Sequence, residues 1–132
     1  TDRMACDVAV ARAVEALGHI DVLLLNAGRS QGCYFEDVTS LDDADTMLAV
    51  NVTGVLNVLH FALPAVPKVA DSRICFVGSV SGAAGVPLRS VYCATKWAIN
   101  GFANALRVEL LDAYGARSPK VVTLNPPEVE SE

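Results

Sequence analysis

The spacing of apolar residues along the chain predicts long helices that alternate with short strands. Apolar side chains recur at helical spacing over 8–17, 41–63 and 90–114. Short continuous apolar runs stand between and after these segments, at 20–25, 74–77 and 121–124. A short run without polar alternation is typical of a strand buried on both faces, as in a parallel sheet. The predicted order is helix, strand, helix, strand, helix, strand.

Individual residues mark where the predicted elements begin and end. Asp2 stands where a helix N-cap is expected, and Gly18 where that helix would end. Pro64 ends the second helix, because proline inside a helix removes a backbone donor. Strands that alternate with long helices form right-handed βαβ units. The sequence therefore predicts a parallel α/β sheet within one domain.

Composition excludes several classes of protein. Apolar residues make up 52% of the 132 residues, too many for a disordered chain. The net charge is −5 and no basic stripe is present, so we expect no nucleic-acid partner, because phosphate contacts need clustered Lys and Arg. The four cysteines show no metal-type spacing, which favours reduced thiols in a cytosol-like compartment.

Two features of the sequence bear on association with a membrane. No apolar run approaches the ~18 residues needed to span a bilayer, and no signal peptide heads the chain. Thr1 is not a usual first residue, so a membrane anchor upstream stays an open question. We expect a location in the cytoplasm or on the cytoplasmic side of a membrane.

The strongest chemical signal lies at the start of the third predicted helix, where Tyr92 precedes Lys96 by four residues. Residues four apart share one helix face, so the phenol and the ammonium group can point into the same space. A nearby cation stabilises a phenolate, which makes Tyr92 a candidate general acid/base. On most helices such a pair is only an amphipathic surface pair, so the context must decide.

Polar residues that follow the predicted strands supply this context. Ser79 comes directly after the second strand, and Asn26, Ala27 and Gly28 end the first. In open parallel sheets ligands bind beyond the carboxyl ends of the strands, so these residues should gather at one edge. Asn51 lies in an otherwise apolar helix, and a buried asparagine needs hydrogen-bond partners, which a functional cavity supplies.

These residues belong to five motifs that stand in a fixed order: LNAG (25–28), NVTG (51–54), GSVSG (78–82), YCATK (92–96) and PPEVES (126–131). With them the chain resembles the short-chain dehydrogenase/reductase family from its first residue to its last. The resemblance implies a doubly wound, Rossmann-type parallel sheet, present here as a single partial domain over 1–132. It also implies an oxidoreductase that transfers hydride between NADP or NAD, with NADP slightly favoured, and a small-molecule ketone or secondary alcohol.

The resemblance also implies a role for each residue. Tyr92 would give a proton to the carbonyl oxygen of the substrate, and Ser79 would hydrogen-bond that oxygen. Lys96 would stabilise the Tyr92 phenolate and hold the nicotinamide ribose hydroxyls. Asn51 would position a water that relays protons toward Lys96. The residues implied to line the cofactor are Asn26, Ala27, Gly28, Tyr92, Lys96, Val129 and Ser131.

Three features depart from the family pattern. Leu25 replaces the first Asn of Asn-Asn-Ala-Gly, which we interpret as a continuation of the buried strand. Pro127 stands where the family has Gly, so this cofactor-facing turn cannot keep its usual geometry. The Gly-rich phosphate loop of the family has no counterpart from Thr1 onward. We therefore interpret the chain as a fragment and expect it, by itself, to be inactive and to bind cofactor poorly.

The substrate class and the role of the protein leave alternatives. FALP (61–64), LRVEL (106–110) and VESE (129–132) are most similar to hydroxysteroid-dehydrogenase-like members. The Pro-Pro-acid turn and FEDV (35–38) are similar to 3-ketosphinganine reductases, and both likenesses imply a hydrophobic, lipid- or steroid-like substrate. The alternatives to an active enzyme of this kind are a non-catalytic homologue with a binding or scaffolding role and a nucleotide-sugar epimerase of the extended branch.

The helix that carries Tyr92 and Lys96 also predicts an oligomer. Its face opposite this pair is expected to hold the large apolar residues Trp97, Ile99, Phe102, Leu106 and Leu110. A sheet can cover only one side of a helix, so the apolar surface needs another partner. We expect a homo-oligomer, in the simplest case a two-fold homodimer, with this helix at the interface. The alternative is that a flanking helix of the same subunit covers this face.

Overall fold

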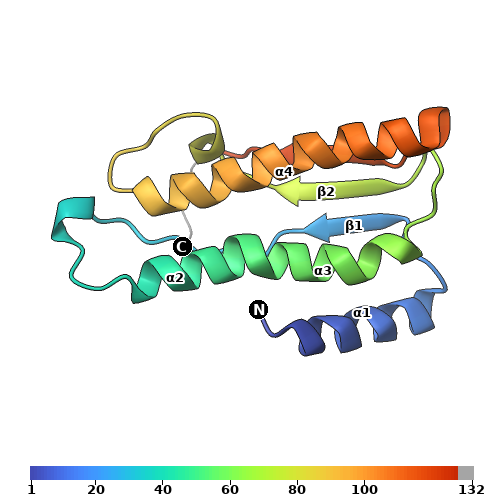
Figure 1. Cartoon of the computed structure of the whole chain (residues 1–132), viewed down its shortest axis with the longest axis horizontal. Helices are drawn as coiled ribbons and strands as arrows, with labels where there is room; N and C mark the ends of the chain where they lie inside the picture. The colour runs from blue at the N-terminus through green and yellow to red at the C-terminus, as the bar shows by residue number, and fades with distance from the viewer. Residues whose placement is uncertain (128–132) are drawn as a thin grey trace.

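The computed structural model describes residues 1–127 and has alternating helices and strands in the predicted order (Figure 1). The helices and strands are α1 (Arg3–Leu17), β1 (Val22–Leu25), α2 (Asp42–Leu48), a π-helical segment (Ala49–Gly54), α3 (Val55–Ala62), β2 (Arg73–Val77), α4 (Ser90–Tyr114) and β3 (Lys120–Leu124). Short 3₁₀ turns lie at Phe35–Asp37 (η1), Leu63–Ala65 (η3), Val80–Gly82 (η4) and Gly115–Arg117 (η5).

The helix α1 begins and ends where Asp2 and Gly18 predict. The Asp2 side chain accepts hydrogen bonds from the backbone N–H groups of Met4 at 2.9 Å and Ala5 at 3.2 Å. These bonds satisfy donors that the first helical turn leaves without a partner. Gly18 ends the helix at φ = 79°, in the region that favours glycine.

The three strands form a parallel sheet in the order β1-β2-β3. Leu23 is in register with Ile74, and Ile74 with Val121, so these three side chains share one face of the sheet. Both connections between neighbouring strands contain long helices, as parallel pairing requires. The α/β class predicted from the sequence is confirmed.

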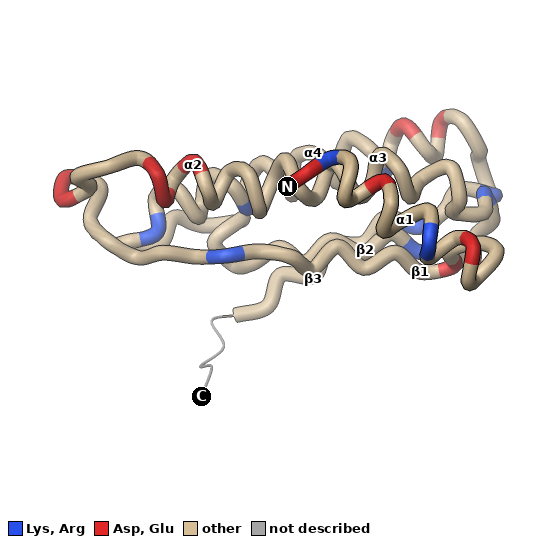
Figure 2. The backbone as a smooth tube through the Cα atoms, turned by 90° about the horizontal axis from the view of Figure 1, so that it is seen from below, with Lys and Arg blue, Asp and Glu red and all other residues tan. Residues whose placement is uncertain are grey.

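One expectation about the strands is wrong. The sequence predicts strands buried on both faces, whereas burial in β1 alternates: Leu23 and Leu25 are buried, but Val22 and Leu24 are exposed. The reason is that α3 and α4 lie over one face of the described sheet (Figure 2). A strand of a half-covered sheet buries only every second residue.

The hydrophobic core lies between this covered face and the helices. Ile74 and Phe76 from β2 are fully buried at its centre. Ala103 from α4 is also fully buried, and the ring of Phe102 meets that of Phe76 edge-on, with centroids 6.1 Å apart. The helix α1 packs against α3 and has no buried residue of its own. The core thus fixes α4 over the sheet, and α4 carries the predicted chemistry.

The second predicted helix is interrupted in a way that the sequence did not predict. Between α2 and α3 the backbone widens into a π-helical segment over Ala49–Gly54. π-Turns inside α-helices are frequent at functional sites. The run Asp42–Ala65 is also long and apolar enough to cross a membrane by length and composition, contrary to the sequence expectation. Part of it is core here, with Val55 and Leu59 buried, so its composition alone assigns no membrane.

Candidate active site

The carboxyl ends of the strands and the start of α4 surround one open cleft of about 720 Å³. Its lining comes from the loops after all three strands, as the parallel sheet predicts, and from the first turns of α4. Tyr92, Lys96 and Ser79 line it together with Asn26 and Gly28. Of the residues predicted for the site, Asn51 and Ala27 lie just outside this lining, and Val129 and Ser131 lie outside the described residues.

Ser79 sits at the end of β2, as the N-cap of the η4 turn. Its Oγ accepts a hydrogen bond from the backbone N–H of Ser81 at 3.2 Å. Since a hydroxyl has one proton and two acceptor positions, this bond leaves the Ser79 proton able to be donated to a ligand. On the other side, the Ser79 backbone N–H donates to Oδ1 of Asn125 at 3.1 Å, which ties the turn to the end of β3.

Tyr92 and Lys96 lie one turn apart on α4, and both side chains face the cleft. The Lys96 Nζ is 5.6 Å from the centroid of the Tyr92 ring. A second cation, the guanidinium of Arg89, is 6.0 Å from the same ring and contacts the Ser30 hydroxyl. Two cationic groups therefore lie within 6.0 Å of the centre of the Tyr92 ring.

Lys96 is buried, with only 5% of its surface exposed. Its Nζ donates a hydrogen bond to the backbone carbonyl of Val77 at 2.8 Å. Burial removes water from the ammonium group and lowers the pKa of Lys96 below its ordinary value. No ion pair to a carboxylate compensates for this among the described residues. A buried cation held by one carbonyl costs stability, which points to a functional reason for it.

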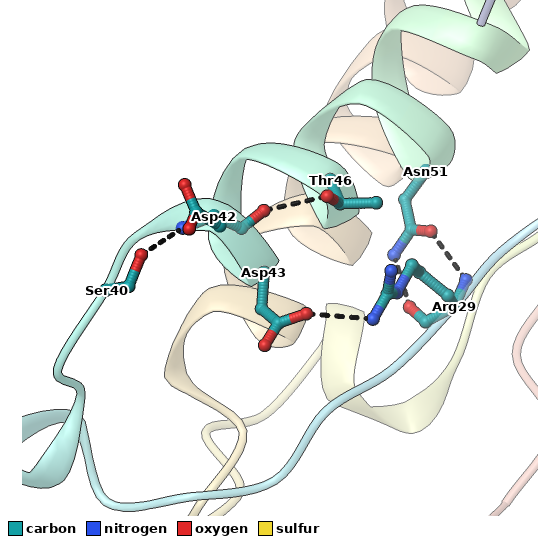
Figure 3. A network of polar contacts seen from close by, with 6 residues as sticks. All are labelled: Arg29, Ser40, Asp42, Asp43, Thr46 and Asn51. Atoms are coloured by element: carbon teal, nitrogen blue, oxygen red, sulfur yellow. Dashed lines mark hydrogen bonds and ion pairs between the residues drawn. The ribbon is translucent and has the colours of Figure 1, made fainter.

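Asn51 lies in the π-helical segment and is 1% exposed. Its Oδ1 accepts from the Arg29 N–H at 2.8 Å, and its Nδ2 donates to the Arg29 carbonyl at 2.9 Å (Figure 3). The Nδ2 also donates to Thr95 Oγ1 at 3.0 Å. The Arg29 guanidinium also pairs with Asp43 at 3.0 Å. The amide therefore joins the loop after β1 to α4, and the predicted water relay stays a prediction.

The loop after β1 passes beside Asn51 and Lys96 at Gly28. A Cβ atom at Gly28 would lie 3.5 Å from Asn51 Oδ1 and 3.6 Å from Lys96 Nζ. Gly28 thus leaves open the space beside the Lys96 ammonium, where a hydroxylated ligand could accept its hydrogen bonds. This space fits the ribose of a nicotinamide cofactor, the group that the sequence predicts beside Lys96.

Pro126 and Pro127 form the part of the cleft wall that follows β3. The carbonyl of Pro126 accepts from the N–H of Val80 at 3.2 Å, so this segment supports the η4 turn. Both prolines are exposed toward the cleft. The expectation that Pro127 alters the cofactor-facing turn stays a prediction, because residues 128–131 of the motif lie outside the described residues.

Sequence reasoning missed three residues that shape the site: Arg89, Asn100 and Asn125. Arg89 lies three residues before Tyr92, and Asn100 four after Lys96, so helical spacing could have indicated both. Asn125 directly follows a predicted strand, as Ser79 and Asn26 do, and the same rule could have found it. The groups that each of them contacts could not be deduced from spacing.

The fold and the site define a class of protein, and similarity to known proteins identifies the family. The fold and the site define a Rossmann-type α/β protein with a Ser, a Tyr and a Lys in one cleft at the carboxyl edge of the sheet. The family model described as short chain dehydrogenase matches residues 1–132. The chain belongs to the short-chain dehydrogenase/reductase family.

Relatives in sequence include the uncharacterized oxidoreductase YusZ of Bacillus subtilis, 38% identical over 79% of this chain and 37% of that protein. The human 17-beta-hydroxysteroid dehydrogenase type 1 is also 38% identical, over 79% of this chain and 31% of its own length. The chain therefore spans about a third of the length of these relatives.

Solved structures have the same fold. A short chain dehydrogenase from Burkholderia cenocepacia in complex with NADP has a TM-score of 0.82 and 32% identity, over 95% of this chain and 49% of that one. ElxO with NADP bound has a TM-score of 0.84 and 26% identity, over 96% and 49%. The Rossmann-type assignment from the sequence is confirmed.

Proposed function

We propose that the protein is an NAD(P)-dependent oxidoreductase that interconverts a ketone and a secondary alcohol at this cleft. The observation that carries the proposal is that Ser79, Tyr92 and Lys96 line one cavity, with a buried cation beside the phenol. A purely structural role would not keep an uncompensated ammonium in that position. This favours an enzyme over the non-catalytic homologue.

Three side chains of the protein have separate roles in the reduction of a carbonyl group. The nicotinamide, when bound, supplies the hydride that reaches the carbonyl carbon. The Tyr92 hydroxyl donates its proton to the carbonyl oxygen. The Ser79 hydroxyl, oriented by the Ser81 N–H, donates a hydrogen bond to the same oxygen and stabilises the charge that develops on it. The Lys96 ammonium stabilises the phenolate that remains and holds the ribose hydroxyls.

We infer that the substrate is hydrophobic, in the lipid or steroid class. The cleft wall beside Ser79 contains Val80, Val86, Pro126 and Pro127, which offer apolar surface to a ligand. Among the relatives at 34–38% identity, several are named hydroxysteroid dehydrogenases. A bulky apolar ketone should therefore be reduced with a higher kcat/KM than a short polar ketone.

We also infer a homo-oligomer through α4, with Trp97 from the predicted set but without three of its other residues. Ile99, Leu106 and Leu110 are buried in the core of this chain, so they cannot face a partner. The sequence expectation was wrong there because Ile99, Leu106 and Leu110 follow Tyr92 at helical spacing and so lie on the same face of α4 as the catalytic pair. Trp97, Val108 and Leu111 are exposed on the opposite side and are spaced for one stripe. A symmetric pairing of this stripe would cover it.

The decisive test of the proposed function is Tyr92→Phe in the whole protein. The change removes the phenolic proton and keeps the ring, so turnover should fall by about 10²–10⁴-fold while cofactor affinity changes little. The matched control is Tyr114→Phe on the same helix, away from the cleft, which should keep turnover. Steady-state assays of nicotinamide oxidation would report both variants. Equal turnover in Tyr92→Phe and wild type would remove the phenol from the reaction.

A further inference from the structure

Asn100 lies one helical turn beyond Lys96, outside the lining of the cleft. Its Nδ2 donates a hydrogen bond to the backbone carbonyl of Gly82 at 2.9 Å. Gly82 is the last residue of the η4 turn, which Ser79 caps. Asn100 therefore links α4, the helix of Tyr92 and Lys96, to the turn that carries Ser79.

The turn and the helix approach each other closely at this point. A Cβ atom at Gly82 would lie 2.5 Å from Asn100 Nδ2 and 2.9 Å from the Lys96 carbonyl oxygen. A Cβ atom at Gly78 would lie 3.1 Å from Asn100 Oδ1. The Asn100 amide thus lies between the glycines at the two ends of the turn, and a side chain at Gly82 would clash with it.

Backbone contacts carry the position of Gly82 to the Ser79 hydroxyl. The Gly82 N–H donates to the Ser79 carbonyl at 2.9 Å, which closes the turn. Within this turn, the Ser81 N–H donates to Ser79 Oγ at 3.2 Å. The direction of the Ser79 hydroxyl therefore depends on the turn, and the turn is held to α4 by the Asn100 amide.

The second polar atom of Asn100 sharpens the interpretation. Its Oδ1 is buried and has no hydrogen-bond partner among the described residues. A buried acceptor without a partner destabilises the folded state, so an apolar side chain would fill this space at a lower cost in free energy. The hydrogen bond to Gly82 is the interaction that an apolar side chain could not make. This bond holds the turn that carries Ser79 and adds nothing to the hydrophobic core.

We propose that Asn100 is a positioning residue for the reaction: it sets the distance between the Ser79 hydroxyl and the Tyr92–Lys96 pair. The inference rests on the proposed function, in which Ser79 and Tyr92 act on the same carbonyl oxygen. Small misplacements of a group that stabilises a transition state are costly, so loss of the bond should lower kcat by about tenfold or more. The affinity for cofactor should change little, because Asn100 does not reach the cleft.

The test compares Asn100→Asp and Asn100→Leu in the whole protein. Both remove the donor to Gly82, one at nearly the same shape and the other with an apolar group. We expect both to lower kcat and kcat/KM together, the pattern of a lost transition-state contact. The matched control is Asn104→Leu on the exposed next turn of α4, whose Oδ1 bonds only Arg107 among the described contacts, and it should keep full turnover.

A double-mutant cycle with Ser79→Ala separates positioning from general stability. If Asn100 acts through Ser79, Asn100→Asp should change kcat by less than about twofold once the serine is gone. Hydrogen exchange at the Ser81 amide should also be faster in Asn100→Asp than in wild type. Equal losses of kcat with and without Ser79, or full activity of Asn100→Asp, would overturn the proposal. Full activity of both Ser79→Ala and Tyr92→Phe would instead overturn the proposed function itself.

Discussion

The two halves of α4 use the same helix for opposite purposes. From Ser90 to Asn100 its buried positions include the polar side chains of Thr95 and Lys96. From Gly101 onward its buried positions are apolar, with Leu106 and Leu110 in the core. The first half places chemistry at the edge of the sheet, and the second half supplies the hydrophobic free energy that holds the helix there. A functional site of this kind is stable because of residues that take no part in it.

The largest effect on stability should come from the apolar half. Leu110 is buried and its neighbour Leu111 is exposed, so the two residues form a matched pair. Leu110→Ala should destabilise the protein by about 2–5 kcal/mol, through lost burial and a cavity. Leu111→Ala should change the free energy of unfolding by only about 0.5 kcal/mol. Denaturant unfolding of the two variants tests this, and equal losses would contradict the placement of Leu110 in the core.

In the polar half of α4, removal of a buried side chain should raise the stability of the protein instead of lowering it. Lys96→Met removes a buried ammonium group, so it should abolish turnover yet stabilise the protein at neutral pH by about 1 kcal/mol. The conservative Lys96→Arg keeps the charge and should show no such gain. A variant that is both inactive and less stable at every pH would refute the assignment of Lys96 as a destabilising functional group.

The pH dependence of this effect has a definite sign. Burial lowers the pKa of Lys96 in the folded state, so above that pKa the unfolded chain binds a proton that the folded chain has lost. The wild type should therefore gain stability relative to Lys96→Met as the pH rises from that lowered pKa toward the ordinary value of 10.5, and level off above it. Unfolding midpoints of both proteins at neutral and alkaline pH measure this difference.

The smallest effect on stability is expected outside both buried halves, at the exposed stripe of α4. Trp97→Glu should change the free energy of unfolding by about 0.5 kcal/mol or less, since the side chain is 53% exposed. If α4 pairs across a two-fold axis, the same variant should be monomeric by light scattering. Val8→Glu, an exposed apolar position on α1, is the control and should keep the oligomer. A monomeric wild type at micromolar concentration would disprove the interface, and a segment of the same subunit would then be the better explanation.

Hydrophobic spacing predicted the order of the elements, and local residues predicted several of their ends. Asp2 and Gly18 cap α1 as expected, and the third helix runs over Ser90–Tyr114 as expected. The motif positions also brought Ser79, Tyr92 and Lys96 to one cleft. These features depend on residues close together in the sequence or on the general geometry of parallel sheets. Both can therefore be inferred without knowing which distant segments touch.

Features that depend on contacts between distant segments were not predicted. The π-helical segment around Asn51 has the same apolar spacing as an α-helix, and the partners of Asn51, Arg29 and Thr95, lie far from it in the sequence. The one-sided burial of β1 depends on which face the helices cover. The contact of Asn100 with Gly82 requires the distance between a helix and a turn, which periodicity does not give.

The tie between Ser79 and Asn125 also has a consequence for the order in which the protein folds. It joins residues 46 positions apart, whereas the bond from Asn100 to Gly82 spans 18. Closing a longer loop costs more entropy before any contact repays it, so the η4 turn should dock on α4 before the segment after β3 reaches Ser79. The last side of the cleft to form would then be the one made by the segment after β3. Changes at Asn125 should accordingly speed unfolding and leave the folding rate nearly unaltered.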